Sequence, residues 1–389
     1  MDNNRYYGGQ NQSKYQPSTI KRKYENDGNG TRNGSTKKQR MEFQNFNATF
    51  MAGVNGVHLV TDQPRLGELQ ETIRKMCNFE RNGFPGSQPV SMDIQNLQLL
   101  STKPYRVSWK ADGTRYMMLI RKKDEIYFFD RNNACFQVFG IQFPCWEDLN
   151  THIYDTLIDG EMVIDKVEGQ SFPQYLVYDV VCYNGNSYME YEFYSEELFS
   201  REQCIKEYII DPRYEAMKRG LINKMSEPFS VRNKDFWDVA LAKKLIEPKF
   251  TKNLGHEPDG LVFQPSADPY IPGQCFDVLK WKPLNMNSVD FKLKIHTESA
   301  GIVTRKVGYL YVGRLQKPFA TIKLSKDLNK YDNKIIECKF ENNEWVFMRE
   351  RTDKSYPNSF NTARAICESI RTPVTTNILE EYIESRRFQ

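Results

Sequence analysis

The sequence predicts an α+β protein with a large first domain and a smaller barrel behind it, and three observations support this fold class. Runs rich in aromatic and β-branched residues follow one another between residues 105 and 182, with helical patterns before and after them. Beyond Pro283 the pattern changes to short strands separated by turns, which is typical of a small barrel. The 389 residues are enough for two domains and a sizeable core.

The expected elements of the first domain follow from these patterns. Helices are expected over about 67–77, from Ser195 onward, and over about 235–247. The helix from Ser195 would carry Glu196 and Glu197 in its first turn and Leu198 on its apolar face. Strands are expected over about 105–110, 115–121, 126–130, 156–164, 175–182, 260–264 and 277–282, with a hairpin turn at 122–125.

The second domain is expected to contain short strands and to be followed by two helices. The strands fall over about 288–296, 306–313, 318–323 and 334–348. The helices fall over about 359–370 and 376–387.

Residues 1 to about 48 are rich in Asn, Gly, Gln, Ser and Lys and contain few aliphatic residues. Such a segment buries too little apolar surface to offset its ordering entropy, so we expect a disordered tail. It contains two basic clusters, at 21–23 and 37–40. These clusters are either part of a solubilising tail, or a nuclear-import signal or weak nucleic-acid-binding arm.

The overall charge, the cysteines and the distribution of apolar residues argue against several classes of protein. The formal net charge is +4, which does not require a nucleic-acid partner, so any basic site must be local. Eight cysteines and four histidines are scattered without a Cys-x-x-Cys pair, which argues against zinc and favours a reduced, intracellular chain. No apolar run approaches the ~18 residues of a membrane span. The polar N-terminus also lacks the apolar segment of a secretory signal.

Lys110 is the first candidate for chemistry. It lies between two strand-like runs and is followed by Ala111-Asp112-Gly113, a turn signal. The turn would hold the lysine at the mouth of a sheet. A lysine amine becomes a nucleophile once neighbouring cations or desolvation favour its uncharged form. The alternative is an ordinary lysine in a hairpin.

Two strands of the first domain carry carboxylates at unusual places. Asp130 and Arg131 end the strand 126–130, where they are either strand-end charges in water or part of a cleft. In the apolar strand 156–164, Asp159-Gly160-Glu161 places charges beside a glycine that permits close backbone approach. A buried charge needs a partner, a metal or a ligand, so structural pairing, a ribose contact and a metal contact all remain open.

Two further strands carry groups suited to a nucleotide. Tyr178, in an apolar run, would pack in the core or stack on a base. Asp259 precedes Gly260 at the start of the next such run. Alternation then places Lys280 and Lys282 on one face of a strand, where their charges repel unless an anion lies between them. A phosphate would satisfy both; a solvated edge strand is the alternative.

A basic group follows late in the chain, at 349–354. It is either a surface charge run or, in a mobile second domain, a group that closes over the terminal phosphates of a nucleotide.

Together and in this order, the motifs resemble the covalent nucleotidyltransferase superfamily of mRNA capping guanylyltransferases and polynucleotide ligases. Lys110-Ala111-Asp112-Gly113 with Arg115 is similar to its nucleotidyl-lysine motif, and the later motifs match at 129–131, 159–161, 175–181, 259–260 and 279–282. Arg351-Thr352-Asp353-Lys354 resembles an element of the capping branch that ligases generally lack. Runs such as 107–120 and 333–354 look like the guanylyltransferase domain of animal capping enzymes, and the resemblance covers about residues 50–387.

The resemblance implies a fold and a reaction. The fold is a nucleotidyltransferase domain of twisted antiparallel sheets with flanking helices over 49–287, then an OB-fold lid over 288–365. A C-terminal helix, 366–389, would pack back on the first domain. In the reaction, Lys110 attacks the α-phosphate of GTP, and the lysyl-GMP then passes GMP to the 5′-diphosphate end of RNA to form the cap.

The resemblance also implies a role for each candidate residue. Phosphate binding and charge neutralisation would fall to Lys280, Lys282 and Arg115, ribose binding to Arg131 and Glu161, base stacking to Tyr178, and guanine reading to Lys234. Mg²⁺ or Mn²⁺ would be supported by Glu161 and Asp259. From the second domain and its junction would come Asp290, Arg349, Arg351, Asp353 and Lys354.

The sequence departs from the animal pattern in one respect. Animal capping enzymes usually carry an N-terminal RNA triphosphatase with a His-Cys-x-x-Gly-x-x-Arg loop, and no His-Cys dipeptide occurs here. We therefore expect a guanylyltransferase-only form, a fragment or a splice product, with the triphosphatase supplied by another chain or a missing domain.

The implied partners are nascent RNA and the phosphorylated C-terminal tail of RNA polymerase II, and the implied location is the nucleus. An ATP-dependent polynucleotide ligase, a non-catalytic RNA-binding OB-fold protein and an inactive scaffold remain as alternatives.

Overall fold

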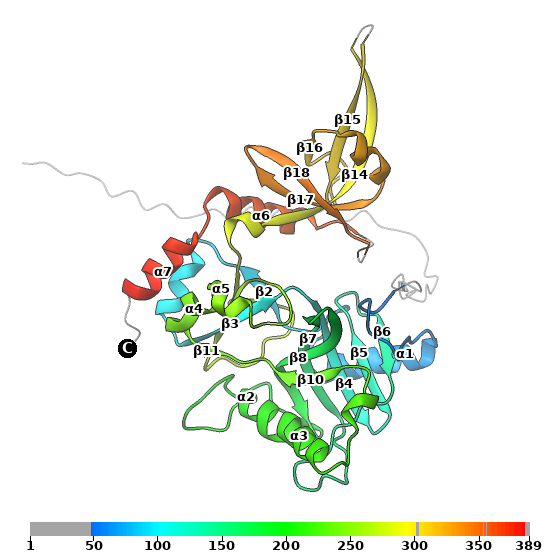
Figure 1. Cartoon of the computed structure of the whole chain (residues 1–389), viewed down its shortest axis with the longest axis vertical. Helices are drawn as coiled ribbons and strands as arrows, with labels where there is room; N and C mark the ends of the chain where they lie inside the picture. The colour runs from blue at the N-terminus through cyan, green and yellow to red at the C-terminus, as the bar shows by residue number, and fades with distance from the viewer. Residues whose placement is uncertain (1–47, 301–302, 353, 355, 386–389) are drawn as a thin grey trace, which may run out of the picture. The chain divides into compact units, whose positions relative to one another are not determined.

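Two β-sheets and a closed barrel organise the chain in the computed structural model (Figure 1). The structure describes residues 48–300, 303–352, 354 and 356–385. Positions 1–47 of the expected tail, with both basic clusters, lie outside these residues, as does Asp353. The predicted α+β class with a barrel after the first domain is confirmed.

The first sheet has eight strands and the second has five. The first runs in the order β1 (Val57–Leu59), β6 (Cys135–Val138), β5 (Glu125–Phe129), β4 (Thr114–Lys122), β7 (Thr156–Val167), β8 (Gln170–Tyr183) and β10 (Ser230–Asn233), with β9 (Asn186–Ser187) paired to β8. The second runs in the order β11 (Trp237–Asp238), β3 (Tyr105–Ala111), β12 (Pro258–Pro265), β13 (Gln274–Trp281) and β2 (Gln88–Ser91). Both are antiparallel except for the pairs β8–β10 and β2–β13.

Both faces of the first sheet are buried because apolar residues occupy both sets of alternating positions in β4. Tyr116 and Met118 lie in one hydrophobic cluster, while Met117 and Leu119 lie in another. The helix α1 (Gln63–Met76) covers the second cluster, and the π-helical segment η2 (Cys204–Ile210) covers the first. The shorter helices nearby are α2 (Arg201–Gln203), α3 (Asp211–Lys218) and the turns η1 (Asn96–Ser101) and η3 (Lys224–Ser226).

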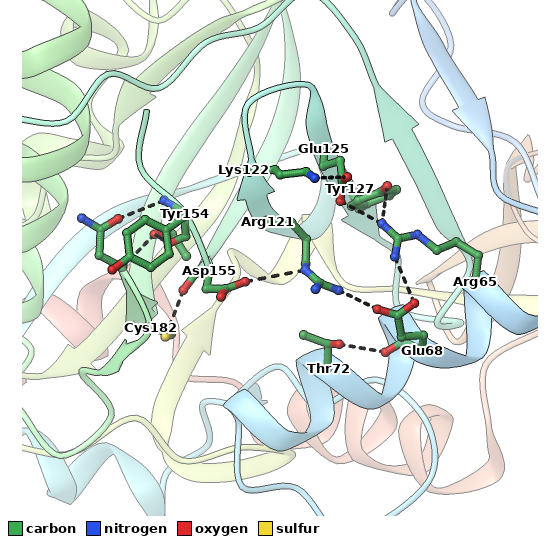
Figure 2. A network of polar contacts seen from close by, with 12 residues as sticks. Arg65, Glu68, Thr72, Arg121, Lys122, Glu125, Tyr127, Tyr154, Asp155 and Cys182 are labelled. Carbon is green, nitrogen blue, oxygen red and sulfur yellow. Dashed lines mark hydrogen bonds and ion pairs between the residues drawn. The ribbon is translucent and has the colours of Figure 1, made fainter. Parts of the chain in front are cut away.

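Charged side chains also tie α1 to the β4–β5 hairpin, as Figure 2 shows. Arg65 donates to Glu125 at 2.9 Å and to the Tyr127 hydroxyl at 3.1 Å. Glu68 accepts from Arg65 at 3.0 Å and from Arg121 at 2.9 Å. These groups are partly solvated, so each pair adds little to stability, but together they fix how the helix lies on the hairpin.

The helix expected from Ser195 is wrong in its start. The Ser195 hydroxyl accepts only a local bond from Leu198 N, and Leu198 is 62% exposed rather than on an apolar face. The helix begins at Arg201, because Ser200 and Gln203 form a reciprocal capping box there. A capping pair five residues downstream therefore determines the boundary.

The helix expected over 235–247 is confirmed only in its second half. Residues Trp237–Asp238 form β11 against β3, and the Asp238 side chain then caps the turn η4 (Val239–Leu241) through Ala240 N. Only α4 (Ala242–Ile246) and α5 (Pro248–Thr251) are helical. Tertiary pairing overrides the local pattern here.

The two strands around Lys110 do not form a hairpin. β3 belongs to the second sheet and β4 to the first, so the chain crosses between the sheets at 112–113. A Cβ at Gly113 would lie 2.4 Å from the carbonyl oxygen of Met162, so a glycine is required at this crossing. Lys110 therefore lies where the two sheets meet.

The barrel closes in the order β14 (Ser288–Ala300), β15 (Val303–Tyr311), β16 (Ala320–Ile322), β18 (Glu344–Glu350) and β17 (Ile335–Glu341), with the turns η5 (Leu284–Met286) before it and η6 (Lys326–Tyr331) within it. The strand expected over 334–348 is two strands, because Asn342 and Asn343 adopt positive φ angles of 50° and 65° and reverse the chain. Figure 1 shows the β14–β15 hairpin projecting from the barrel.

The two C-terminal helices contact different cores. α6 (Phe360–Arg371) packs Ala363, Ile366 and Ile370 against the barrel, so the first part of the expected helix 366–389 joins the core of the barrel rather than that of the first domain. α7 (Thr376–Ser385) places Leu379 and Ile383 in the hydrophobic cluster of the second sheet. All helices of the described residues fall short of the length and apolarity needed to cross a membrane.

Candidate active site

Lys110 and Lys282 share one carboxylate. The Nζ of Lys110 lies 2.7 Å from Oδ1 of Asp259, and the Nζ of Lys282 lies 2.5 Å from Oδ2. All three side chains are largely buried, with 16–28% of their surface exposed. Asp259 pairs with Lys282 and with Lys110 of β3 rather than with Lys282 and Lys280, so the predicted phosphate between Lys280 and Lys282 stays a prediction.

The backbone of β12 explains how Asp259 reaches both lysines. Gly260 pairs with Lys110 across β3, and the register shifts between Pro258 and Gly260. Gly260 has a φ of 148°, and a Cβ there would lie 2.0 Å from the carbonyl oxygen of Trp281. Only glycine permits this approach, which brings Asp259 between the strands that carry Lys110 and Lys282.

The charges around Asp259 affect its ionisation. Burial alone would raise the pKa of Asp259, but the ammonium groups of Lys110 and Lys282 outweigh burial and lower it. The carboxylate is therefore ionised at neutral pH and is a weak base. It suits orientation of the two lysines better than removal of a proton.

Two further lysines lie in the same electrostatic environment. Burial, together with the charges of Arg131 and Lys110, lowers the pKa of Lys280 to about 8. Burial likewise lowers the pKa of Lys234 to about 8, with Glu161 acting in the opposite direction. Neither forms an ion pair with a carboxylate of the described residues, so both have positive charge to offer an anionic ligand.

Lys234 is positioned by a parallel strand pair. It follows β10, and its backbone N donates to Val177 O at 2.8 Å. Its ammonium lies 5.4 Å from the centroid of the Trp109 ring and 5.7 Å from that of Tyr178. The predicted stacking residue and the predicted base-reading residue therefore lie together.

Asp159 is the hub of a buried network behind these groups. It accepts bonds from Nε and Nη2 of Arg115 at 2.9 and 2.5 Å, from the Tyr178 hydroxyl at 2.9 Å and from the Tyr270 hydroxyl at 2.7 Å. Of the alternatives for this carboxylate, structural pairing is the one observed. Burial alone would lower the pKa of Arg115, but Asp159 outweighs burial and raises it well above its ordinary value.

Arg115, predicted to bind phosphates, thus commits two of its nitrogens to Asp159. Antiparallel pairing places it directly across from Glu161 of β7, so the two side chains share a face. Glu161 is half-buried and has no ion-pair partner in the described part of the chain. It therefore offers a free carboxylate beside Lys234.

Arg131 lies on an exposed turn after β5. The Asp130 carboxylate accepts from Asn132 N and Ala134 N at 2.9 and 2.8 Å, which holds this turn. The turn presents Arg131 close enough to influence Lys280. Asp130 therefore positions Arg131.

The predicted metal ligands do not form a protein-only metal site. Both oxygens of Asp259 are paired with lysines. Within the ranges that the structure describes, no three His, Cys, Asp or Glu side chains gather as metal ligands. A divalent cation that keeps most of its ligands as nucleotide oxygens and water would need only Glu161.

The candidate residues of the second domain gather around two carboxylates of the barrel. Asp290 accepts from Arg351 at 2.9 Å and from Lys354, and Glu337 accepts from Arg349 at 2.6 Å. Carboxylates of β14 and β17 therefore hold the basic run in place, although Arg349 remains 55% exposed. Asp353 lies outside the described residues.

Sequence patterns did not identify Tyr270, His256 or the role of Asp159. Tyr270 lies 111 residues from Asp159 in sequence, and a lone tyrosine in a loop carries no signal of such a contact. Asp159 was recognised as a buried charge, but its partner Arg115 lies 44 residues away in another strand.

Comparison with known proteins identifies the family. Residues 51–284 match the family model for the "mRNA capping enzyme, catalytic domain", and residues 286–380 match the model for its C-terminal domain. The chain is 52% identical over 353 residues to the "mRNA-capping enzyme" of Mus musculus, covering 90% of this chain and 58% of that protein. It is 40% identical over 379 residues to the "mRNA-capping enzyme" of Caenorhabditis elegans, covering 94% and 59% respectively.

A third relative is covered more fully. The "mRNA-capping enzyme subunit alpha" of Schizosaccharomyces pombe is 30% identical over 351 residues, which cover 83% of this chain and 85% of that protein. The chain thus spans less than two thirds of the animal relatives but most of the yeast subunit. With its catalytic-domain match enclosing Lys110, Asp259 and Lys282, the chain belongs to the mRNA capping enzyme family.

Proposed function

We propose that the chain is an mRNA guanylyltransferase that transfers GMP from GTP, through Lys110, to the 5′-diphosphate end of RNA. The observation that carries this proposal is the Lys110–Asp259–Lys282 cluster, with Lys280 and Lys234 beside it. The match to the capping-enzyme catalytic domain supports it.

In the first step, Lys110 must lose a proton to solvent before its amine can attack. A bond then forms between Nζ and the α-phosphorus of GTP, and the bond from that phosphorus to the bridging oxygen of pyrophosphate breaks. Asp259 orients Lys110 through the bond at 2.7 Å. Phosphoryl transfer needs positioning and charge neutralisation more than acid–base groups, which suits a site rich in lysine.

The neighbouring residues then have the following roles. Lys280 and Lys282 would hold the α-phosphate and offset the charge of the transition state. Tyr178 would stack on the base and Lys234 would read guanine. Arg131 and Glu161 would bind the ribose. Arg115 would fix Tyr178 through their shared partner Asp159.

Mg²⁺ or Mn²⁺ would be held by Glu161 together with oxygens of the nucleotide, and it would supply further charge neutralisation. Loss of labelling in the presence of EDTA, regained on adding either ion, would support this assignment; labelling that persists would remove it.

The barrel would act as an OB-fold lid. Its basic residues Arg349, Arg351 and Lys354 are held by Asp290 and Glu337, and on closure they would exchange these carboxylates for the β- and γ-phosphates. The lid would then reopen so that the RNA end could reach the lysyl-GMP. In the second step, an oxygen of the RNA diphosphate attacks the phosphorus, and the bond from phosphorus to Nζ breaks.

The wider setting is part of the same proposal. The substrate would be nascent RNA, recruitment would use the phosphorylated tail of RNA polymerase II, and the site of action would be the nucleus. The basic clusters at 21–23 and 37–40 support nuclear residence. A reporter fused to residues 1–48 that stays cytoplasmic would remove this support.

The deciding experiment is covalent labelling. We expect α-³²P-GTP with Mg²⁺ or Mn²⁺ to label the protein on a denaturing gel, with acid-labile, alkali-stable label that pyrophosphate releases. Lys110→Ala should abolish labelling because it removes the nucleophile. Lys122 is an exposed lysine paired with Glu125, so Lys122→Ala should label like the natural sequence.

Each alternative has its own outcome. Label from α-³²P-ATP instead of GTP would identify a ligase. No label from either nucleotide in folded protein would overturn the proposal and leave a binding protein or scaffold. Transfer of the GMP to 5′-diphosphate RNA, but not to 5′-monophosphate RNA, would support the second step.

A further inference from the structure

Three side chains connect the first sheet to the second at the residue before Lys110. Trp109 of β3 donates its indole Nε1–H to Nε2 of His256 at 2.9 Å. The other ring nitrogen of His256, Nδ1, lies 2.8 Å from Oδ1 of Asp165 in β7. All three side chains are nearly or largely buried, with 6%, 7% and 15% exposed for Trp109, His256 and Asp165.

The contacts fix the protonation of the imidazole. An indole nitrogen can only donate, so Nε2 of His256 must accept and carries no proton. The proton of the neutral ring then lies on Nδ1 and is donated to Asp165. Gln174 donates to the second oxygen of Asp165 at 3.0 Å, which orients the carboxylate. In this relay, Asp165–His256–Trp109, the donor and the acceptor of both hydrogen bonds of His256 are therefore determined.

The backbone around His256 is built to support the relay. A Cβ at Gly255 would lie 2.6 Å from Cγ of Asp165, so only glycine allows this approach. The Gly255 carbonyl accepts from Lys166 N at 2.6 Å, and the Glu257 carbonyl accepts from Asp112 N at 3.1 Å. The segment 255–257 is therefore bonded both to β7 and to the residue two positions after Lys110.

The relay ends at the Trp109 ring, which lies beside residues of the candidate active site. The Trp109 ring lies 5.4 Å from the ammonium of Lys234 and packs beside Trp237 and Phe250. Lys110 follows Trp109 directly in β3, and its side chain leaves the opposite face of that strand. The orientation of the indole thus affects both the strand that carries the nucleophile and the lysine beside the base site.

We propose that His256 is a positioning residue for nucleotide binding, which holds Trp109 so that Lys110 and Lys234 meet GTP in one geometry. This inference rests on the proposed guanylyltransferase function. The competing view is a histidine that only fills the core. His152 is such a residue in the same domain: it accepts from Phe143 N at 2.9 Å and its Nδ1 lies 2.7 Å from Ile153 O.

The test compares His256→Leu, His256→Gln and the matched control His152→Leu in the full chain. The end point of labelling at saturating α-³²P-GTP with pyrophosphatase counts active molecules, and the rate per active molecule then gives KM and kcat. We expect His256→Leu to raise KM for GTP about tenfold, as for loss of one buried hydrogen bond, with a smaller change in kcat.

His256→Gln should restore KM to within about threefold, because an amide oxygen accepts from the indole while the amide nitrogen donates to Asp165. His152→Leu should leave KM and kcat unchanged and should at most lower the fraction of molecules that are active. If His256→Leu also changes only the active fraction, or if Gln gives the KM of Leu, the proposal is overturned. If His256→Leu does not fold, Trp109→Phe, which keeps a ring but lacks the N–H, must raise KM to the same extent.

A second readout does not depend on activity. The indole ¹⁵N–¹H resonance of Trp109, identified by its loss in Trp109→Phe, should be protected from exchange. It should shift in His256→Leu but not in His152→Leu. An unmoved resonance would overturn the relay, whatever the enzyme does. A resonance that moves as expected in a protein that GTP does not label would overturn the guanylyltransferase function and the nucleotide-positioning role, while leaving the relay itself established.

Discussion

At the scale of single residues, the site gathers four lysines around few carboxylates. Lys110 and Lys282 share Asp259, whereas Lys234 and Lys280 have no such partner among the described residues. The second pair explains how an anionic nucleotide would be favoured. Burial has made the charges of Lys234 and Lys280 unfavourable, and the base and the phosphates of the nucleotide would replace the water around them.

This arrangement predicts a pH dependence of nucleotide binding. The pKa of both Lys234 and Lys280 is lowered to about 8, so both are ammonium ions below that pH and lose their charge above it. A phosphate bound at Lys280 and a guanine bound at Lys234 both favour the charged form of the lysine, so the affinity should fall as pH rises, on the order of tenfold per group by pH 9. The measurement is Kd from pH 6.5 to 9.5 for a GTP analogue with a methylene bridge between the α- and β-phosphates, which Lys110 cannot cleave.

Lys280→Arg supplies the control. A guanidinium keeps its charge throughout this range, so the decrease in affinity should be shallower than in the natural sequence. A Kd for the natural sequence that stays constant to pH 9.5 would contradict the assignment of Lys280 to phosphate binding and of Lys234 to guanine binding.

Local patterns were enough to predict some of these residues and not others. Alternation in β13 placed Lys280 and Lys282 opposite Leu279 and Trp281, and the buried state of the latter two agrees. The partner of Asp159 was not predictable, because a carboxylate in an apolar strand signals that a partner is needed but not which one. Arg115 and Tyr270 reach it from distant parts of the chain.

At the scale of elements, glycines determine how closely the strands of the site approach one another. A Cβ at Gly160 of β7 would lie 2.5 Å from the Tyr175 ring and 2.6 Å from Leu176 O on β8. This close pairing lies between Asp159 and Glu161, so any separation of the two strands would displace both carboxylates.

Gly160→Ala is therefore expected to destabilise the protein by about 1–3 kcal/mol through overpacking. Gly67→Ala is the matched control: Gly67 is an exposed position inside α1 with no atom within 4 Å of a Cβ, and alanine there should stabilise the helix by about 0.5–1 kcal/mol. Urea unfolding followed by tryptophan fluorescence compares the two. Equal midpoints for the variants would contradict the packing argument.

Element boundaries were predicted well where the pattern and the pairing agree. The strands at 105–110 and 115–121 appear as β3 and β4 nearly as expected. The hairpin considered as the alternative for Lys110 is absent, and strand patterns alone do not reveal which sheet a strand joins. The helix begins at Arg201 because Ser200 and Gln203 form a capping box, whereas the sequence pattern favours Ser195 as the start.

At the scale of the whole molecule, the chain ends by completing the core of its first domain. The Trp281 indole donates to Val374 O at 2.7 Å, and Leu379 and Ile383 of α7 join Leu261, Leu279 and Trp281 in one cluster. Trp281 stands between Lys280 and Lys282 in sequence, so the last helix supports the strand that carries two phosphate-binding candidates. The two-domain organisation was predictable from the change of pattern after Pro283. The packing of α7 on the first domain was expected only from the family resemblance, since nothing in the local pattern distinguishes its partner from that of α6.

This support predicts that a change in α7 reaches the site. Leu379 is 1% exposed, and Leu379→Ala should destabilise the first domain by about 2–5 kcal/mol through loss of buried surface and a residual cavity. Ile378, 37% exposed on the same helix, is the matched control, and Ile378→Ala should cost under about 1 kcal/mol. Because a protein of two domains need not unfold in one step, the comparison uses the urea midpoint of the first transition. The second measurement is KM for GTP in the folded variants. An increase for Leu379→Ala alone would link the last helix to the strand that carries Lys280 and Lys282. An unchanged KM despite the lost stability would show that α7 has only a structural role.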